Sequence, residues 1–481
     1  MLLATLALLF SQAPAPTGSV SLGRHHFTLP AGLKITQVAG SPLVDRPVSA
    51  VFDTRGRLFV TESSGSNEPA AVQAEKKPHR VLRLVDDNGD GVFDRRTVFA
   101  DNLMLPQGIC VVGDEVWVGT PPKIWRLIDA DDDGVAEKRT LWHDGGTLTG
   151  CMNDLHGPAV GLDGFIYWTK GAFAEQKHTL AGGETLVTKG SHIFCARQDG
   201  SGRQAVLNGG MDNPVGLAFS PLGDVFLTCT FVHRPGGGTG LRDGVLHAVE
   251  GGLWGKDHDP IHTPHHLWTS PDLMPVLADL GPAAPCGLTR ARSERLGLKD
   301  QLLSCQFNLR RVQTHALRPS GSALEAGSKD FLVSDHPDFH PTDVLEDADG
   351  SMLVVDTGGW YKLCCPSSQM VKDQSLGAIY RITRADGPAA DKTIEDPRGL
   401  NLAHLASVSL LADHRPVVRD RALDALVQPV PPASPVAPAR LKRDPEPPGD
   451  GPPATRPKPN GQGSVRGDPQ WFCRLPAHRP A

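Results

Sequence analysis

The chain has 481 residues, a formal net charge of −6 at pH 7 with both signs spread along it, and many glycines (52) and prolines (42). This charge balance gives no basic surface for nucleic acid, and the glycine and proline content favours a β-rich chain with many turns. After the first residues, no segment approaches the roughly 20 apolar residues that span a bilayer, so we expect at most peripheral membrane association.

Residues 1–15 begin with an apolar run from Leu2 to Phe10 and continue with small residues. A short apolar run followed by small residues such as Ser11 and Ala13 resembles a secretory signal peptide. We therefore predict a signal peptide over 1–15 and export to the periplasm or the extracellular space. The alternative is a frayed apolar tail.

Residues 25–386 repeat one phrase, a glycine in a turn followed by a short alternating apolar strand. The turn glycines are spaced by 57, 51, 59 and 127 residues, at Gly56, Gly113, Gly164, Gly223 and Gly350. The last spacing is about two periods, and residues 302–317 supply apolar runs for the missing unit. A further strand follows most units, at 79–84, 123–128, 191–196 and 377–382. Repeats of about 40–60 residues built from short strands are typical of propeller blades. We predict an all-β, six-bladed β-propeller over 25–386, with five or seven blades as alternatives.

The sequence changes character after the last of these strands. Residues 398–428 carry apolar side chains at helical spacing, including Leu405, Val408 and Leu411, which predicts a short, incomplete helical hairpin in the style of HEAT repeats. Residues 429–481 are rich in proline and arginine and poor in large apolar side chains. Such a segment buries too little apolar surface to fold, so we predict a disordered tail.

Two acidic loops share one pattern, DDNGDGVFD at 86–94 and DADDDGVAE at 129–137. Oxygen-bearing side chains occupy positions 1, 3, 5 and 9 and glycine occupies position 6, which gives Asp86, Asn88, Asp90 and Asp94, then Asp129, Asp131, Asp133 and Glu137. Calcium prefers about six to eight oxygen ligands in such loops. Threonine at position 12 and the lack of flanking helices exclude an EF-hand. We predict structural Ca²⁺ in both loops, with solvated acidic turns as the alternative.

Several phrases together resemble a known propeller family. They are LPQGICV (105–111), GLDGFIYW (161–168), DNPVGLAFSPLGDVFLT (212–228), GGLWG (251–255), VVDTGGWY (354–361) and GAIYRI (377–382). The family is the membrane-bound dehydrogenase propeller of planctomycetes and verrucomicrobia, which is similar to soluble quinoprotein sugar dehydrogenases. The resemblance implies pyrroloquinoline quinone (PQQ) as cofactor, a sugar or alcohol as substrate and, for an enzyme, a cytochrome as electron acceptor. No C-x-x-C-H motif occurs, so we expect no covalent c-type haem in this chain.

The resemblance also implies a catalytic base. In the sugar dehydrogenases a histidine eight residues before the glycine of G-x-D-G-x-I-Y takes the proton of the substrate hydroxyl. The same count from Gly161 falls on Asn153, and His156 lies three residues later. Both are candidate catalytic residues, with His156 as the base, which must be neutral to accept a proton. The alternative role for His156 is that of a polar residue at a blade entrance.

The cofactor would need cations for its carboxylates. Arg310 and Arg311 are the candidates for this role, together with Asn213 at a second family landmark. The family has an arginine directly before that asparagine, whereas this chain has Asp212.

Two hypotheses for the function follow. One is a quinone-dependent sugar or alcohol dehydrogenase; the other is a non-catalytic, calcium-stabilised propeller that binds carbohydrate or a protein partner. Tryptophans such as Trp168 and Trp254 could stack on a sugar ring or pack between blades. Four histidines within 258–266 could hold a metal ion or form a polar inter-blade loop.

Overall fold

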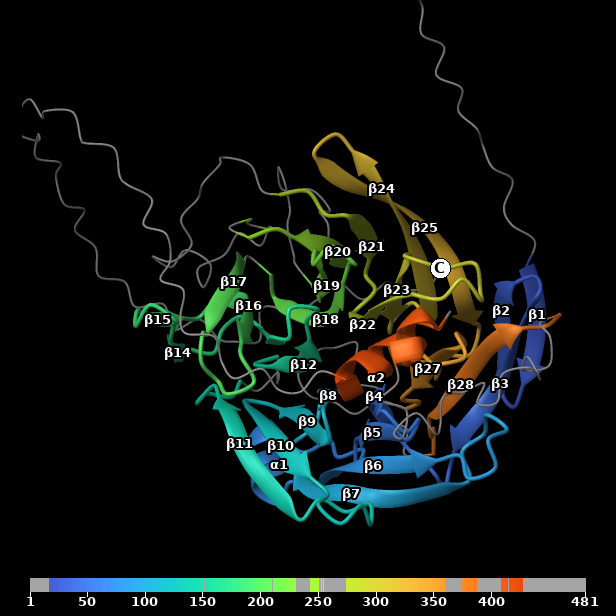
Figure 1. Cartoon of the computed structure of the whole chain (residues 1–481), viewed down its shortest axis with the longest axis horizontal. Coiled ribbons are helices and arrows are strands. Elements are labelled where there is room, and N and C mark those ends of the chain that lie inside the picture. The colour runs from blue at the N-terminus through green and yellow to red at the C-terminus, as the bar shows by residue number, and fades with distance from the viewer. Residues whose placement is uncertain are drawn as a thin grey trace, which may run out of the picture.

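The computed structural model describes residues 17–149, 153–209, 211–230, 243–250, 252, 254, 274–359, 374–386, 408–413 and 415–426. Six antiparallel sheets stand around a central axis, as Figure 1 shows, and each contributes four radial strands. The predicted six-bladed β-propeller is therefore confirmed.

In the first four blades the innermost strand comes first in sequence. The first blade contains β4 (Pro47–Phe52), β5 (Leu58–Glu62), β6 (His79–Val85) and β7 (Arg95–Leu103). The second contains β8 (Gly108–Val112), β9 (Glu115–Thr120), β10 (Lys123–Ile128) and β11 (Lys138–Asp144). The third contains β12 (His156–Val160), β13 (Ile166–Lys170), β16 (Ser191–Ala196) and β17 (Gln204–Gly209), and it carries a hairpin of β14 (Gln176–Thr179) and β15 (Thr185–Thr188).

The remaining blades have the same arrangement of four radial strands. The fourth contains β18 (Asn213–Phe219), β19 (Val225–Thr230), β20 (Asp243–Ala248) and β21 (Ala278–Gly281). The fifth contains β22 (Pro285–Arg290), β23 (Leu302–Gln306), β24 (Arg311–Ser320) and β25 (Ala323–Ser334), extended by β2 (His25–Pro30) and β1 (Thr17–Leu22). The sixth contains β26 (Pro341–Glu346), β27 (Met352–Asp356) and β28 (Ala378–Arg384) and is completed by β3 (Leu33–Gly40).

The predicted turn glycines connect the first and second strands of five blades. All five have positive φ, between 60° and 92°, which a glycine adopts without strain. The fifth blade instead joins β22 to β23 through residues 291–301, which explains why its repeat lacks the phrase.

The hydrophobic core is divided among the blade interfaces. One cluster, for example, joins Leu58 and Leu82 of the first blade to Val355 and Ile379 of the sixth. Because each interface buries both faces of the middle strands, β5, β13, β23 and β27 are buried along their whole length. Strands that are buried on both faces can be apolar at successive positions, so these four strands are buried more continuously than the alternating pattern in the sequence indicated.

The ring closes between the sixth and first blades. β3 pairs with β28, so an N-terminal strand completes the last blade. Near the axis, Asp343 on β26 accepts hydrogen bonds from Ser49 Oγ (2.7 Å) and Ala50 N–H (3.0 Å) on β4. Backbone pairing and a buried carboxylate therefore both hold the two ends of the propeller together.

Helices contribute little to the described chain. α1 (Ala70–Lys76) lies between β5 and β6. A 3₁₀ turn (Val408–Ala412) and α2 (Pro416–Leu426) represent the predicted helical segment, whose first residues lie outside the described range. Asp420 on α2 pairs with Arg292, so α2 lies near the end of β22. No helix in the described ranges is long and apolar enough to cross a membrane.

Candidate functional site

The inner strands begin at one end of the central axis, which we call the mouth of the channel, and three polar residues stand at the starts of neighbouring inner strands there. His156 is the first residue of β12, Asn213 is the first residue of β18, and Gln107 directly precedes β8. A Cβ atom at Gly108 would lie 2.5 Å from the carbonyl oxygen of Gly157, so glycine is needed for these strands to approach. The close approach places Gln107 and His156 on neighbouring strands at the channel mouth. We call the group of Gln107, Asn153, Asp154, His156, Lys170 and Asn213 the entrance site.

His156 is held in its neutral form. Its side chain is buried, with 8% exposure of the residue, and Nε2 lies 2.8 Å from Asn213 Oδ1. Burial lowers the pKa of the imidazole to about 4, although the hydrogen bond with Asn213 partly opposes the shift. With Asn213 Oδ1 as acceptor, Nε2 carries the proton and Nδ1 carries the lone pair. A neutral imidazole is the form that a general base requires.

Asn153 joins the same site from the loop before β12. Its Oδ1 accepts a hydrogen bond from Thr149 Oγ at 3.0 Å, and its Nδ2 donates to the carbonyl of Asp212 at 3.4 Å. Its own carbonyl accepts from Gly171 N–H at 2.7 Å. The sequence-predicted Asn153, His156 and Asn213 therefore converge where the third and fourth blades meet.

Asp154 and Lys170 lie behind these residues and were not predicted from the sequence. Asp154 Oδ2 accepts from Thr149 N–H at 2.8 Å, whereas its Oδ1 is buried without a hydrogen-bond partner among the described residues. Lys170 Nζ donates to the carbonyls of Gly171 and Gly190, each at 2.8 Å. The signal in the sequence was a lysine that ends the otherwise apolar strand IYWTK.

Burial shifts both ionisable groups toward their neutral forms. It lowers the pKa of Lys170 to about 7, and the charge of Asp154 opposes this shift. It also raises the pKa of Asp154, which hydrogen bonds from Thr149 and the charge of Lys170 oppose. The entrance site thus holds a lysine that exchanges its proton near neutral pH, next to amides and an imidazole.

Arg310 ends the connection from β23 to β24 in the fifth blade, and Arg311 is the first residue of β24. Arg311 Nε donates to Gln306 Oε1 at 2.8 Å, and Nη1 pairs with Asp330 at 3.2 Å. Arg310 Nε is buried without a partner in the described structure. No hydrogen bond or ion pair links either arginine to the entrance site within that part of the chain.

The entrance site suits a hydroxyl-bearing ligand better than PQQ. Amides and a neutral imidazole donate to and accept from hydroxyl groups. The quinone's carboxylates would need cations beside the base, but the ammonium of Lys170 is used by two carbonyls. The entrance site itself therefore supplies no cation for the quinone's carboxylates, and Arg310, whose Nε is buried without a partner among the described residues, remains the candidate for that role.

The tryptophans and histidines singled out in the sequence lie elsewhere. Trp168 and Trp254 are each 1% exposed, so they pack inside the propeller and present no face to a sugar ring. Residues 255–273, which contain the four clustered histidines, lie outside the described residues.

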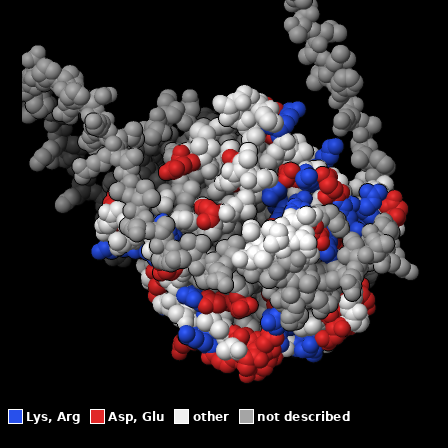
Figure 2. Space-filling model, in the orientation of Figure 1, with Lys and Arg blue, Asp and Glu red and all other residues white. Residues whose placement is uncertain are grey.

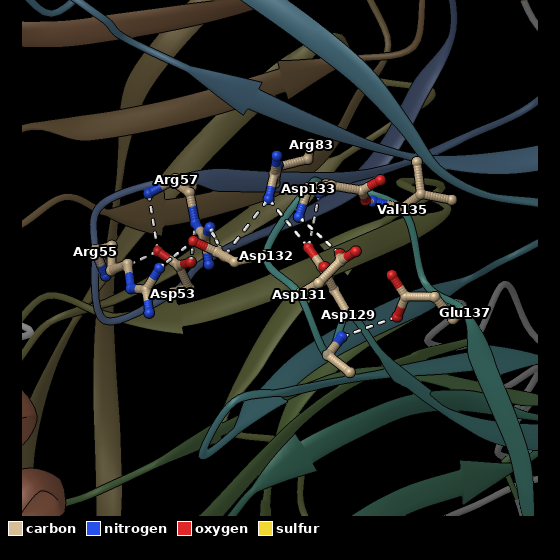
Figure 3. Close-up of polar contacts among 12 residues, drawn as sticks. Asp53, Arg55, Arg57, Arg83, Asp129, Asp131, Asp132, Asp133, Val135 and Glu137 are labelled. Atoms are coloured by element: carbon tan, nitrogen blue, oxygen red, sulfur yellow. Dashed lines mark hydrogen bonds and ion pairs between the residues drawn. The ribbon is translucent and has the colours of Figure 1, made fainter.

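In the second acidic loop, the four side chains that were predicted to bind calcium lie close together. Asp129, Asp131, Asp133 and Glu137 each offer a carboxylate oxygen, and these atoms all lie within 4.8 Å of one another. Figure 3 shows the four side chains around one point. Within the described ranges, no other group of three or more acidic, histidine or cysteine side chains is so compact.

Asp129 anchors this loop and keeps one oxygen free. Its Oδ2 accepts from Gly134 N–H at 2.9 Å and pairs with Arg83 Nη1 at 3.2 Å. Its Oδ1 has no partner among the described residues, although only 8% of the side chain is exposed. A buried carboxylate oxygen without a donor is costly, so this atom is available to a further ligand.

A neighbouring carboxylate ties the loop to the first blade. Asp132 pairs with Arg55 and, at 2.5 Å, with Arg57 Nη1, both in the turn between β4 and β5 (Figure 3). Figure 2 shows acidic side chains gathered over β7 with basic ones beside them. The acidic loops therefore belong to the outer surface and are separate from the entrance site.

In the first acidic loop, both carboxylate oxygens of Asp86 accept hydrogen bonds from the loop's own backbone. Asp86 Oδ1 accepts from Gly89 N–H at 2.7 Å and Oδ2 accepts from Gly91 N–H at 2.8 Å. The carbonyl of Gly91 accepts from Arg381 Nε of the sixth blade at 3.2 Å. The two loops have nearly the same sequence, but only the second combines converging carboxylates with a free buried oxygen.

Fold and site together define a six-bladed β-propeller with a polar site at the mouth of its channel. Residues 19–386 match the family described as "Domain of unknown function (DUF7133)", and the chain belongs to this family. No curated protein matches the sequence.

Solved structures with a TM-score of 0.50 include three propellers. The first is a putative oxidoreductase (glucose dehydrogenase) from Thermus thermophilus, with 18% identity over 73% of this chain and 100% of that one. The second is the pyranose dehydrogenase PQQ domain from Coprinopsis cinerea, with 13% identity over 77% and 98%. The third is a family AA12 carbohydrate-active enzyme from Trichoderma reesei, with 12% identity over 74% and 97%. At these identities the similarity shows the fold alone.

Proposed function

We propose that the entrance site binds a neutral sugar or alcohol and that the protein oxidises it, with His156 as the base. The observation that carries the proposal is the neutral, buried imidazole joined to Asn213 at 2.8 Å at the mouth of the channel. Oxidation of an alcohol to a carbonyl removes one proton and one hydride. Nδ1 of His156 would receive the proton, and a quinone of the PQQ class, if bound, would accept the hydride.

The surrounding residues would recognise the rest of the ligand. Gln107 Oε1 and Asp154 Oδ1 are buried oxygens without partners in the described structure, and each could accept a bond from a hydroxyl. Because these groups are neutral or shifted toward neutrality, a neutral polyol suits the site better than a charged metabolite. The dehydrogenases with similar folds, by their names, act on glucose and on pyranoses, which supports a sugar as the first substrate to test.

A second candidate function is binding without oxidation. Asn153 stands at the position where the related sugar dehydrogenases carry their histidine, and Asp212 stands where they carry an arginine. These two departures favour a calcium-stabilised propeller that binds carbohydrate or a protein partner.

We also propose that the second acidic loop holds a structural Ca²⁺ ion. Asp129, Asp131, Asp133 and Glu137 supply four carboxylates, and backbone carbonyls and water would complete the coordination of about six to eight oxygens. The free Oδ1 of Asp129 supports this proposal, because a cation would satisfy it.

One set of experiments separates the two functions. A panel of sugars and alcohols is titrated calorimetrically against the protein, and the same panel is assayed for reduction of a dye with PQQ and calcium added. The oxidation proposal predicts both saturable binding and dye reduction. Saturable binding without dye reduction for any compound would leave the binding function alone.

Two variants test whether the ligand binds at the entrance site. Asn213→Ala should weaken binding at least tenfold, whereas Gln198→Ala, an exposed amide in the turn between β16 and β17, should not change it. Equal affinity in the wild type and Asn213→Ala would show that the ligand binds elsewhere.

A further inference from the structure

Four buried nitrogen atoms without hydrogen-bond partners gather between the second and third blades. They are His143 Nε2, Gln176 Nε2, His178 Nδ1 and Arg203 Nε. His143 lies on β11, Gln176 and His178 lie on β14, and Arg203 directly precedes β17. Three separate segments therefore meet at this point with unused polar atoms.

Ring contacts show that these residues form one cluster. The His143 and His178 rings stack with centroids 5.7 Å apart and planes 15° apart. The Arg203 guanidinium lies 5.9 Å from the ring centroid of Trp168, and the His143 ring lies 4.8 Å from the same tryptophan. Both histidines are almost fully buried, at 3% and 1% exposure. His143 and Arg203 therefore both contact Trp168, and His178 Nε2, 3.2 Å from Gln176 Oε1, joins the glutamine to the cluster.

Only positive charge acts on this cluster. Burial lowers the pKa of His143, and Arg203 and His178 lower it further. Burial lowers the pKa of His178 to about 4, with further contributions from Arg203 and Lys170. Within the described residues, the Arg203 side chain forms no hydrogen bond or ion pair, and burial lowers the pKa of its guanidinium. A partly buried cation without an acceptor is unfavourable, so the cluster lacks an anion.

A cavity adjoins the cluster at Arg203. This cavity of about 360 Å³ is lined by Thr179, Leu180 and Ala181 of the hairpin turn and by residues 200–203. Arg203 belongs to both the cavity lining and the buried cluster, so a small ligand in the cavity would lie next to the cluster.

We propose that this cluster binds a small oxyanion, a carboxylate, sulfate or phosphate group. A guanidinium recognises such groups through charge-assisted hydrogen bonds. Arg203 Nε and Gln176 Nε2 supply donors, and His143 supplies another when Nε2 carries its proton. Because His143 belongs to the second blade and Gln176 to the hairpin, the bound anion links the two blades. The site is separate from the entrance site and does not depend on the proposed oxidation.

The test is calorimetric titration of the full chain with sodium sulfate, sodium phosphate or sodium acetate at constant ionic strength set with sodium chloride. We expect saturable 1:1 binding of at least one of the three, and the ranking identifies the class of oxyanion. Arg203→Met should weaken this binding at least tenfold. Arg197→Met is the matched control, because Arg197 is exposed and lies 5.3 Å from the Phe165 ring in the same turn region.

A second readout covers the case in which Arg203→Met does not fold. The bound oxyanion should slow amide hydrogen exchange in the hairpin of residues 176–188 of the wild type, and Gln176→Leu should reduce that protection. The absence of saturable binding for all three anions would overturn the proposal and leave water as the occupant. Unchanged affinity in both Arg203→Met and Gln176→Leu would also overturn it.

Discussion

The substitution Asp133→Asn is expected to change stability in opposite directions with and without calcium. Asn keeps the oxygen that accepts Val135 N–H at 2.8 Å, so the loop geometry is preserved while one charge is removed. Without a cation, the substitution relieves repulsion among the carboxylates. With calcium, it removes a charged ligand and weakens binding.

The magnitudes follow from the spacing of the carboxylates. Two like charges 4.8 Å apart repel by about 0.9 kcal/mol in water. Asp133 has three carboxylate neighbours within that distance, so its neutralisation relieves about 2.6 kcal/mol in water, and salt reduces this to roughly 1.5 kcal/mol because the side chain is exposed. Calcium at about 100 times its Kd stabilises the folded state by about 2.7 kcal/mol. The loss of this contribution exceeds the relief of repulsion, so the sign must reverse.

The assay is thermal unfolding in excess chelator and in excess calcium. The wild type should melt roughly 5 °C higher with calcium, at about 2 °C per kcal/mol, and Asp133→Asn should lose most of this shift. Asp90→Asn in the first loop is the matched control, because Asp90 Oδ1 accepts Val92 N–H at the same 2.8 Å. Calcium-independent melting of the wild type, or identical behaviour of the two variants, would refute the reasoning.

Two further predictions concern stability. Arg381→Met removes the cation that lies 2.6 Å from Asp347 in an ion pair whose side chains are only 6% and 1% exposed. Urea unfolding should show that the free energy of unfolding falls by about 3–5 kcal/mol. A decrease below about 1 kcal/mol would contradict a stabilising buried ion pair. Acidification from pH 6.5 to 4 should also destabilise the protein. In this range the unfolded chain binds protons on histidines that stay neutral in the folded protein, so the free energy of unfolding falls as the pH falls. The buried histidines whose pKa is lowered to about 4 are His25, His79, His156, His178 and His315. Five buried carboxyl groups act in the opposite direction: Asp343 and Asp356, with pKa values raised to about 6 and 7, and Asp154, Glu346 and Asp347, whose pKa values burial also raises. The histidines still outnumber them, because burial lowers the pKa of His143 as well. Denaturant midpoints that rise on acidification would contradict this balance.

The propeller could be predicted because its repeat has a local cause. Gly56, Gly113 and their equivalents occupy turns of positive φ, and glycine is the residue that adopts them without strain, so each blade leaves the same mark. The β1–β2 extension of the fifth blade left no such mark. Its few ladder contacts, Phe27 with Ser334 and Thr28 with Val333, join residues some 300 positions apart.

The candidate sites were predictable only in part. The sequence predicted calcium in both acidic loops alike, because oxygen-bearing residues occupy the same positions in both. Their difference depends on which backbone N–H groups reach Asp86 and Asp129, and a neighbouring blade influences that through Arg83. Likewise, Lys170 becomes notable only through its burial beside Asp154, which no local pattern encodes.

The central claim is that His156 acts as a base on a bound sugar or alcohol at the mouth of the channel. The most direct test is dye reduction by the wild type and by His156→Ala with the substrate that binds most tightly, in the presence of PQQ and calcium. Loss of a general base should lower kcat by roughly 10²–10⁴-fold while KM changes little. Equal kcat values for the two proteins, or no reduction by the wild type with any substrate that binds, would contradict the claim.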